Sequence, residues 1–256
     1  MAFDLTGRTA LVTGASRGLG RGIARCLAMA GADVAVSYLG SRDQADSAVA
    51  EIQALGRRAF AVQGDVGREA DVRRIFDRLS SEFNGVDILV NNAGINSDFN
   101  IYDMTVEEWQ RILNTNLTGN FLCAKYAVEM MRPRRYGRII QISSVVGQQG
   151  ALYGHVHYAA TKGGQLSFTK TLARTVAADG ITVNAIAPGV HITEQVEAVL
   201  GKENATTRLD AVLKAIPAGH FGSVEDIGWT AVFLSSAEAG YITGATFDVN
   251  GGLSMR

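Results

Sequence analysis

Short runs of apolar and β-branched residues recur along the chain and alternate with longer stretches of helical spacing. Most of these runs are continuously apolar rather than alternating, so we expect strands that are buried on both faces of a sheet. The regular alternation of strand and helix predicts a parallel, doubly wound α/β sheet with helices on both faces. The seven predicted strands are residues 9–14, 33–38, 58–63, 86–91, 138–143, 181–186 and 245–250.

No linker, repeat or low-complexity segment interrupts this alternation, so residues 1–256 are expected to form a single domain. Pro133 is predicted to end a helix, and Pro188 is predicted to lie in a turn just after the sixth strand. Residues 191–222 break the rhythm as a long insertion after that strand. Because α/β sheets bind ligands at this edge, we expect the insertion to be a mobile lid over the substrate.

The composition is that of a globular protein, with 47% hydrophobic and 19% charged residues. A formal net charge of −1 gives no attraction to nucleic acid or to an anionic membrane, so neither is an expected partner. Cys26 and Cys123 are far apart and belong to no CxxC pair, so we expect two buried, free thiols. The N-terminus lacks the pattern of a secretion signal, and no apolar run is long enough to span a bilayer. A cytoplasmic protein is therefore expected.

The first predicted strand runs directly into a glycine-rich turn, TGASRGLG, which an amphipathic helix follows. Glycine permits a tight turn there, and the backbone N–H groups at the helix start attract a pyrophosphate. The strand–turn–helix context favours a dinucleotide site over an ordinary glycine-containing loop. The turn residues expected to contact the cofactor are Gly14, Ser16, Arg17, Gly18, Leu19 and Gly20.

The end of the second predicted strand favours NADP over NAD. An acidic residue at this place would bind the adenosine ribose hydroxyls of NAD, but the chain has Tyr38 there. Arg42 follows shortly, and Arg17 lies in the glycine turn. Neutral and basic groups suit a 2′-phosphate, so Tyr38, Arg17 and Arg42 are assigned to it. The alternative is that both arginines are solvated surface charges.

Two further strand ends carry candidate cofactor contacts. Asp65 and Val66 end the third strand, where a carboxylate suits the adenine amino group and Val66 suits the ring; alternatively, Asp65 caps the helix that follows. The sequence NNAG ends the fourth strand at the same edge. Its small residues and amides permit a close backbone approach to the cofactor, although the segment read alone is also a plain turn. The residues assigned there are Asn91, Ala93 and Gly94.

Tyr158 and Lys162 are four positions apart in a predicted helix, so both lie on one face. Read alone, the pair is either a stray polar pair on a half-exposed helix or a phenol whose acidity is raised by a fixed cation. The surrounding motifs decide between these. In chain order they are TGxxxGxG, DV, NNAG, an asparagine in NTNLTG, a serine in ISSVVG, YxxxK and PG.

This order resembles the short-chain dehydrogenase/reductase family over essentially the whole chain. The resemblance implies a Rossmann-type sheet of seven strands and hydride transfer between a nicotinamide cofactor and a ketone or secondary alcohol. It also implies that Tyr158 is the general acid or base, with its phenolate favoured by Lys162. Ser144 would hydrogen-bond the substrate oxygen, Lys162 would hold the nicotinamide ribose, and Asn116 would fix a water.

The resemblance extends to the segment after the sixth strand. Pro188, Gly189, His191 and Thr193 match the positions at which relatives hold the nicotinamide amide, although relatives usually have an apolar residue in place of His191. His155 and His157 form an HxH pair beside Tyr158. No carboxylate or cysteine cluster accompanies the pair, so pocket lining is expected rather than metal binding. Ser144 and Tyr158 are 14 positions apart, one more than in close relatives.

These observations favour an NADP(H)-dependent reductase of 3-oxoacyl thioesters. A sugar, polyol or small secondary-alcohol dehydrogenase is the alternative within the family, and a cofactor-binding regulatory protein is the alternative outside it. The small and apolar helix at 159–178 and the apolar tail predict a homotetramer. Acyl carrier protein is a doubtful partner. Relatives dock that acidic carrier through basic residues, and this chain has Arg134 and Arg135 at one such place but Asp179 at the other.

Overall fold

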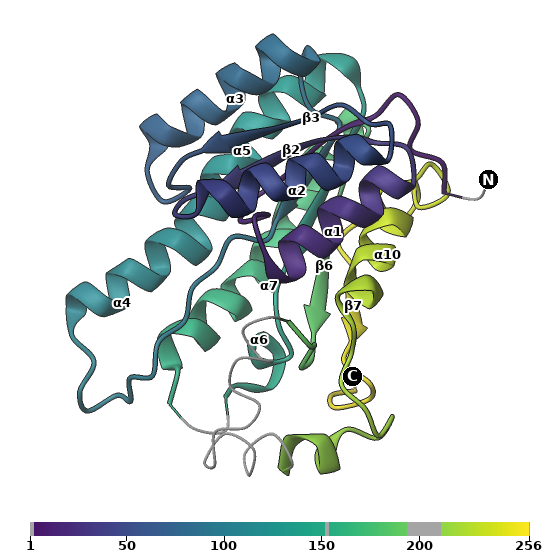
Figure 1. Cartoon of the computed structure of the whole chain (residues 1–256). Helices are drawn as coiled ribbons and strands as arrows, with labels where there is room; N and C mark the ends of the chain where they lie inside the picture. The colour runs from purple at the N-terminus through teal and green to yellow at the C-terminus, as the bar shows by residue number, and fades with distance from the viewer. Residues whose placement is uncertain (1–2, 152–153, 194–210, 256) are drawn as a thin grey trace.

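A computed structural model describes residues 3–151, 154–193 and 211–255. Seven strands form one parallel sheet in the order β3-β2-β1-β4-β5-β6-β7. Figure 1 shows the helices that cover this sheet. The doubly wound α/β fold predicted from the sequence is therefore confirmed. The strands are β1 Thr9–Val12, β2 Asp33–Tyr38, β3 Ala59–Gln63, β4 Ile88–Asn91, β5 Gly137–Ile142, β6 Ile181–Pro188 and β7 Thr246–Val249.

Continuous apolar sequence and burial on both faces go together in this sheet. Every residue of β1, β4, β5 and β6 is buried. One core cluster packs α1, α2 and α10 on one face of the sheet, and a second packs α3, α5 and α7 on the other. These helices are α1 Gly18–Met29, α2 Arg42–Ala54, α3 Glu69–Phe83, α5 Gly119–Met131, α7 Val156–Val176 and α10 Val224–Ser235.

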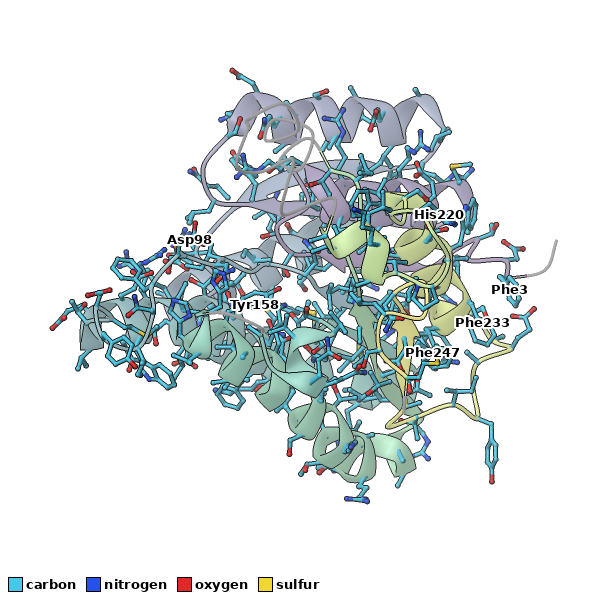
Figure 2. The ribbon with its side chains drawn as sticks, turned by 90° about the horizontal axis from the view of Figure 1, so that it is seen from below. Phe3, Asp98, Tyr158, His220, Phe233 and Phe247 are labelled. Carbon is cyan, nitrogen blue, oxygen red and sulfur yellow. The ribbon has the colours of Figure 1, made fainter. Side chains whose placement is uncertain are left out.

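Short elements flank β4, β5 and β6. Those that directly precede β5 and β6 lie at the amino edge of the sheet, and those that follow β4 and β5 shape the active-site edge. The short elements are the helix α4 Val106–Leu113, the π-helix η1 Asn114–Thr118, the 3-10 helix η2 Arg132–Arg134, the helix α6 Val146–Gln149 and the 3-10 helix η3 Ala177–Asp179. Because all strands are parallel, their carboxyl ends meet at this edge. Figure 2 shows Tyr158 and Asp98 on one side of the molecule and the ring group of Phe3, Phe233 and Phe247 on the other.

The two proline predictions have different outcomes. α5 ends at Met131, and Pro133 lies in η2 directly after it, as predicted. Pro188 was predicted to lie in a turn, and this was wrong, because β6 continues to Pro188 and pairs it with Val249. Proline lacks only the N–H, and at the last position of a strand its carbonyl still serves as an acceptor. The backbone N–H of Val145 donates to that carbonyl at 3.0 Å.

The predicted lid, 191–222, is described only at its two ends, and residues 194–210 lie outside the described residues. The two ends meet. His191 forms a parallel bridge with Gly222, and the N–H of Ile192 donates to the Gly222 carbonyl at 2.8 Å. The insertion therefore leaves and rejoins the fold at one place, beside the carboxyl end of β6.

Two further sequence expectations concern the thiols and the membrane. Cys26 and Cys123 are buried and free, as predicted. Burial raises the pKa of Cys26 to about 11 and that of Cys123 to about 12, so both thiols stay protonated. Among the residues described, no helix is long and apolar enough to cross a membrane.

Candidate active site

The glycine turn after β1 has the shape that a bound dinucleotide requires. Gly14 and Gly18 have φ values of +63° and +56°, which residues with a Cβ atom rarely adopt. A Cβ atom on Gly20 would lie 2.9 Å from the Ala15 Cα atom. The turn is therefore closely packed, and the N-terminus of α1 opens directly from it. This cradle fits a pyrophosphate, the most negative part of a nicotinamide dinucleotide.

Asn92 fixes this turn from the neighbouring strand end, a role that the sequence analysis missed. Its side-chain Nδ2 donates to the carbonyls of Thr13, at 2.9 Å, and Gly14, at 3.1 Å. The Thr13 hydroxyl oxygen in turn accepts the N–H groups of Asn92 and Ala93, both at 3.0 Å. Asn91 was assigned to the cofactor, but its buried side chain donates away from the turn, to the Asn120 carbonyl at 3.2 Å. Its Oδ1 atom is buried without a hydrogen-bond partner.

The predicted adenosine end lies between β2, β3 and the start of α2. Tyr38 is only 6% exposed and packs in the core, whereas Arg17 and Arg42 are exposed. Arg42 is the first residue of α2 and pairs with Asp46 at 3.3 Å. Both arginine side chains stand in solvent, where they are available to a phosphate.

Asp65 and Val66 follow β3 at the same edge. The Asp65 carboxylate accepts the Gly67 N–H at 2.9 Å, and Val66 is buried. Because Arg68 is the N-cap of α3, the alternative that Asp65 caps this helix is wrong. Asp65 instead closes a tight turn just before the helix begins.

Tyr158 and Lys162 lie in the first two turns of α7, one above the other. The Lys162 Nζ atom is 5.5 Å from the centroid of the Tyr158 ring and donates to the Ile142 carbonyl at 2.6 Å. Burial lowers the pKa of Lys162 to about 7, because a buried ammonium loses its hydration. Burial also raises the pKa of Tyr158, and a hydrogen bond with Ser144 offsets part of that rise. Without a cofactor, the phenol therefore keeps its proton.

Asn116 lies in the π-helix η1 and is completely buried. Its amide clamps the backbone of Ile95, since Oδ1 accepts the Ile95 N–H at 2.8 Å and Nδ2 donates to the Ile95 carbonyl at 2.9 Å. A Cβ atom on Gly94 would lie 3.5 Å from Asn116 Oδ1 and 3.7 Å from Lys162 Nζ. Both side chains thus lie close to Gly94, on the side to which a Cβ atom would point. Single π-turns inside helices are frequent at functional sites.

Ser144 follows β5 and faces Tyr158. Its hydroxyl oxygen accepts the Val146 N–H at 3.1 Å, and the same side chain is close enough to the Tyr158 phenol to lower its pKa. The neighbouring Ser143 points the other way and donates to the Lys162 carbonyl at 2.9 Å, which fixes α7 against the end of β5. The four residues predicted to be catalytic, Asn116, Ser144, Tyr158 and Lys162, therefore converge from η1, the end of β5 and α7.

The segment after β6 closes the site from a third side. A Cβ atom on Gly189 would lie 2.9 Å from the Asn250 Cα atom, so the backbone passes close to the end of β7. His191 is buried, and its Nδ1 atom lies 3.3 Å from the Gly189 carbonyl oxygen. Burial lowers the pKa of His191, so its ring is neutral near pH 7. A cavity of about 270 Å³ beside the glycine turn is lined by Gly18, Thr193 and Val224, among others.

Comparison with known proteins agrees with this geometry. The family model described as enoyl-(acyl carrier protein) reductase matches residues 14–254. A 3-oxoacyl-[acyl-carrier-protein] reductase from Staphylococcus epidermidis is 44% identical over 248 residues, which are 97% of this chain and 99% of that protein. The chain belongs to the short-chain dehydrogenase/reductase family. It is therefore an oxidoreductase of carbonyl and alcohol groups that uses a nicotinamide cofactor.

Solved members of the family share the whole fold. A short-chain type dehydrogenase/reductase from Mycobacterium marinum superposes with a TM-score of 0.92 at 35% identity, over 99% of this chain and 98% of that one. A second structure, from Agrobacterium tumefaciens, is provisionally named a 2-deoxy-D-gluconate 3-dehydrogenase and contains bound NADP. It superposes with a TM-score of 0.88 at 37% identity and covers 98% of both chains.

Of the two histidines beside Tyr158, His157 departs from the pocket-lining expectation. His157 is completely buried, so it lines no open pocket. His155 is partly exposed, and its Nε2 atom lies 3.6 Å from an oxygen of Asp98. Within the described residues, no group of three or more His, Cys, Asp or Glu side chains is placed to hold a metal ion.

Proposed function

We propose that this protein reduces the 3-oxo group of an acyl thioester with NADPH. The observation that carries the proposal is the pairing of two hydroxyl groups, those of Ser144 and Tyr158, in a buried site above Lys162. A ketone oxygen accepts two such donors at once, and negative charge develops on that oxygen during reduction. The 44% identity to a 3-oxoacyl-[acyl-carrier-protein] reductase over almost the full length supports the same substrate class.

The side chains of this protein supply the proton and position the substrate oxygen that receives it, and the bound nicotinamide would supply the hydride. Tyr158 donates its phenolic proton to the substrate oxygen, which its raised pKa allows over the whole neutral range. Ser144 donates a second hydrogen bond to the same oxygen and so positions it. The pKa of Lys162, about 7, lies near the working pH, so this side chain can gain and lose a proton during turnover.

The family model that matches the chain is described by enoyl reduction, which acts on a carbon–carbon double bond. The geometry favours the carbonyl reaction instead. Ser144 and Tyr158 can both donate to the ketone oxygen that becomes the alcohol, whereas in an enoyl thioester the reacting carbon accepts no hydrogen bond and only the thioester carbonyl does. The relatives at 43–44% identity are likewise 3-oxoacyl reductases. We therefore propose that an enoyl thioester is not a substrate.

NADP is proposed as the preferred cofactor on the basis of charge. Arg17 and Arg42 are exposed at the glycine turn and at the start of α2, and Tyr38 stands at the end of β2 where NAD binding would need a carboxylate. Guanidinium groups bind phosphate oxygens through paired hydrogen bonds. The related structure with bound NADP shows that this fold accepts the phosphorylated cofactor.

A carrier protein is proposed to be dispensable for turnover. Asp179 pairs with Arg132 at 3.3 Å, and Arg134 pairs with the buried Asp87. Arg135 donates to the Ala178 carbonyl at 2.8 Å. The basic side chains near η2 and η3 are thus already engaged inside the chain, and a carboxylate stands among them, which weakens attraction to an acidic carrier.

The sequence also predicted a homotetramer, and this remains a proposal. Phe121 on α5 and Trp229 on α10 are 50% and 45% exposed, although both are large apolar side chains. They lie on helices that cover opposite faces of the sheet. Two separate apolar contacts of this kind would suit an assembly with two kinds of subunit interface. Light scattering on the purified protein tests this directly.

A second candidate, oxidation of a sugar acid, is favoured by the 37% identity to the structure provisionally named a 2-deoxy-D-gluconate 3-dehydrogenase. One substrate panel separates the candidates. A 3-oxoacyl thioester, an enoyl thioester, and a gluconate with its 3-oxo form are each assayed with NADPH, NADP, NADH and NAD at 340 nm. The proposal predicts the highest kcat/KM for the 3-oxoacyl thioester with NADPH. A higher value for the sugar acid or the enoyl thioester would refute it.

A further inference from the structure

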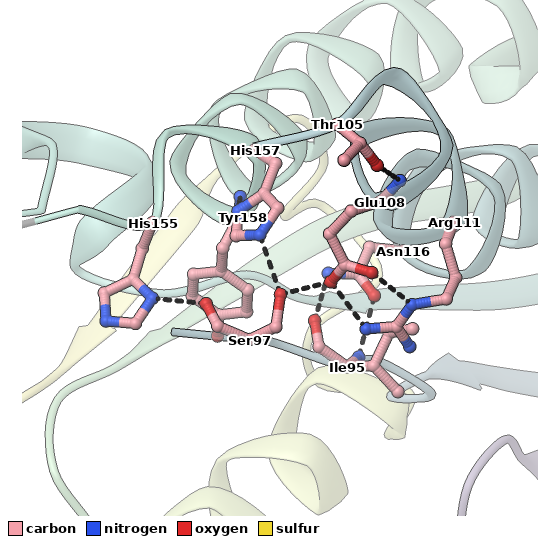
Figure 3. A network of polar contacts seen from close by, with 9 residues as sticks. All are labelled: Ile95, Ser97, Thr105, Glu108, Arg111, Asn116, His155, His157 and Tyr158. Atoms are coloured by element: carbon pink, nitrogen blue, oxygen red, sulfur yellow. Dashed lines mark hydrogen bonds and ion pairs between the residues drawn. The ribbon is translucent and has the colours of Figure 1, made fainter. Parts of the chain in front are cut away.

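A chain of polar side chains runs from the backbone of Tyr158 to helix α4, and Figure 3 shows it from close by. The Tyr158 N–H donates to His157 Nδ1 at 2.8 Å, and His157 Nε2 lies 2.9 Å from the Ser97 hydroxyl oxygen. Ser97 donates to Glu108 through a short hydrogen bond. Arg111 donates to both oxygens of Glu108, at 2.7 and 2.8 Å. None of the four side chains belongs to the catalytic set.

The direction of each hydrogen bond from Tyr158 through His157 and Ser97 to Glu108 follows from the charge on Glu108. Arg111, with help from Ser97, lowers the pKa of Glu108 to about 2, so the carboxylate is ionised and can only accept. Ser97 must therefore give its only proton to Glu108. The Ser97 oxygen then accepts from His157, which places the imidazole proton on Nε2 and leaves Nδ1 as an acceptor. The Tyr158 N–H requires that same tautomer from the other end.

The Tyr158 N–H needs this acceptor because of its place in α7. The first four N–H groups of a helix have no partner within it, and the Tyr158 amide is one of them. His155, the N-cap residue, makes no side-chain cap to the helix. The His157 ring supplies the missing acceptor and is completely buried in doing so. A buried N–H without an acceptor is costly, so the start of α7 depends on this ring.

Ser97 belongs to a segment that also contacts the catalytic residue Asn116. The Asn116 amide clamps Ile95 through two hydrogen bonds, and Ser97, two residues further on, holds His157. The Ser97 backbone carbonyl also accepts a hydrogen bond from His155 Nδ1, at 3.0 Å. The segment from Ile95 to Ser97 therefore links Asn116 to His157, and through His157 to the backbone of Tyr158.

We infer that His157 is a positioning residue for the reaction, which holds the backbone of Tyr158 in place through Nδ1 while Ser97 and Glu108 fix its tautomer. The inference rests on the proposed carbonyl reduction. A second proton on His157 would sit on Nδ1 and point at the Tyr158 N–H, so only the neutral ring is compatible with this arrangement. Displacement of a reacting group by about 1 Å can cost on the order of 100-fold in rate.

The charges around His157 determine when it becomes protonated. Glu108 and Arg111 face it from α4, and His155 faces it from the segment before α7. Burial lowers the pKa of His157 below its ordinary value of 6.5, and the carboxylate of Glu108 opposes part of this. The ring is therefore neutral near pH 7 and gains its second proton only below pH 6.5. Turnover is expected to fall in that acidic range.

Two substitutions of His157 separate its two nitrogen atoms. In H157N the amide oxygen can replace Nδ1 but cannot reach Ser97, and in H157Q the amide can reach Ser97 but leaves the Tyr158 N–H without its acceptor. We expect kcat of H157N to stay within about 3-fold of the parent at pH 8, and kcat of H157Q to fall at least about tenfold. The Kd for NADPH should change less than about 3-fold in both. The acidic fall in kcat should be smaller in H157N than in the parent, and any fall that remains is shared with Lys162, whose pKa is about 7 in both proteins.

Three results would overturn the inference. The first is a kcat of H157Q within twofold of the parent. The second is an equal loss of kcat in H157N and H157Q, together with equal losses of Tm and of cofactor affinity. The third is an acidic fall in kcat that is the same in H157N as in the parent. Nitrogen NMR of the parent protein, where no variant has to fold, must show the His157 proton on Nε2, and a proton on Nδ1 would also overturn it. This measurement needs no substrate, so a failed substrate panel refutes the proposed function without deciding the role of His157.

Discussion

Replacement of Lys162 by methionine should stabilise the cofactor-free protein while abolishing its turnover. Lys162 is 4% exposed, and burial lowers its pKa from 10.5 to about 7. This difference corresponds to about 5 kcal/mol of destabilisation whenever the side chain is charged. Methionine fills a similar volume without that cost, but it cannot donate to the Ile142 carbonyl, which accepts from Lys162 at 2.6 Å. Loss of that hydrogen bond removes about 2 kcal/mol.

The net gain for K162M is therefore about 3 kcal/mol at pH 6, and it should shrink as the pH rises. The folded-state pKa is below the unfolded one, so between about pH 7 and 10.5 the unfolded chain binds more protons. The stability of the parent must then rise with pH relative to K162M. Over the two pH units from 7 to 9 the parent regains about 3 kcal/mol, which brings the two proteins to nearly equal stability at pH 9.

Urea unfolding of both proteins without cofactor, at one protein concentration and at pH 6, 7, 8 and 9, measures this difference. Lys170→Met is the matched control, because Lys170 is an exposed lysine on the same helix. Its difference from the parent should stay within about 0.5 kcal/mol at every pH. A stability difference between K162M and the parent that is constant from pH 6 to 9 would show that Lys162 does not titrate in this range.

Three further predictions follow from the site. Tyr158→Phe should retain NADPH binding and lose about 10²- to 10⁴-fold in kcat, and turnover within about twofold of the parent would contradict its role as the acid. The parent should prefer NADPH, and Tyr38→Asp should reverse the preference through repulsion of the 2′-phosphate; a higher kcat/KM of the parent with NADH would refute this. The same 3-oxoacyl group should be reduced about equally well on carrier protein and on a short thioester. A preference of about tenfold for the carrier that disappears with salt would show that Asp179 does not weaken docking.

The strands were predictable because this sheet is buried on both sides. A strand with helices on each face has no solvent-facing position, so its sequence is continuously apolar and its limits are easy to locate. β2 was predicted at its exact bounds, and the other strands within a few residues. Pro188 was misplaced because a proline within an apolar run reads as a break. The Pro188 carbonyl accepts the Val145 N–H, and this contact cannot be predicted from the position of the proline in the sequence.

The sequence predicted the site residues that belong to a motif. It did not predict those whose role depends on a contact between residues that are distant in sequence. The choice between Asn91 and Asn92 depends on which of two adjacent side chains faces the glycine turn, and a shift of one residue in strand register reverses it. His157, Ser97 and Glu108 are ordinary polar residues, separated by up to 60 positions. Nothing in their local sequence links them, because their connection is made by the packing of α4 against α7.

The electrostatics of the cofactor-free site determine whether Tyr158 carries its proton before the cofactor binds. Lys162 was expected to favour the phenolate form of Tyr158, yet burial dominates and raises the pKa of that phenol. The same burial leaves Lys162 charged in only about half of the molecules near pH 7, which weakens its pull on the phenol proton. Before a cofactor binds, the site therefore holds a protonated acid next to Ser144. Oxidation of an alcohol would need the phenolate first, whereas reduction of a ketone uses the proton already present. The acid that the proposed carbonyl reduction needs is therefore already protonated in the cofactor-free protein.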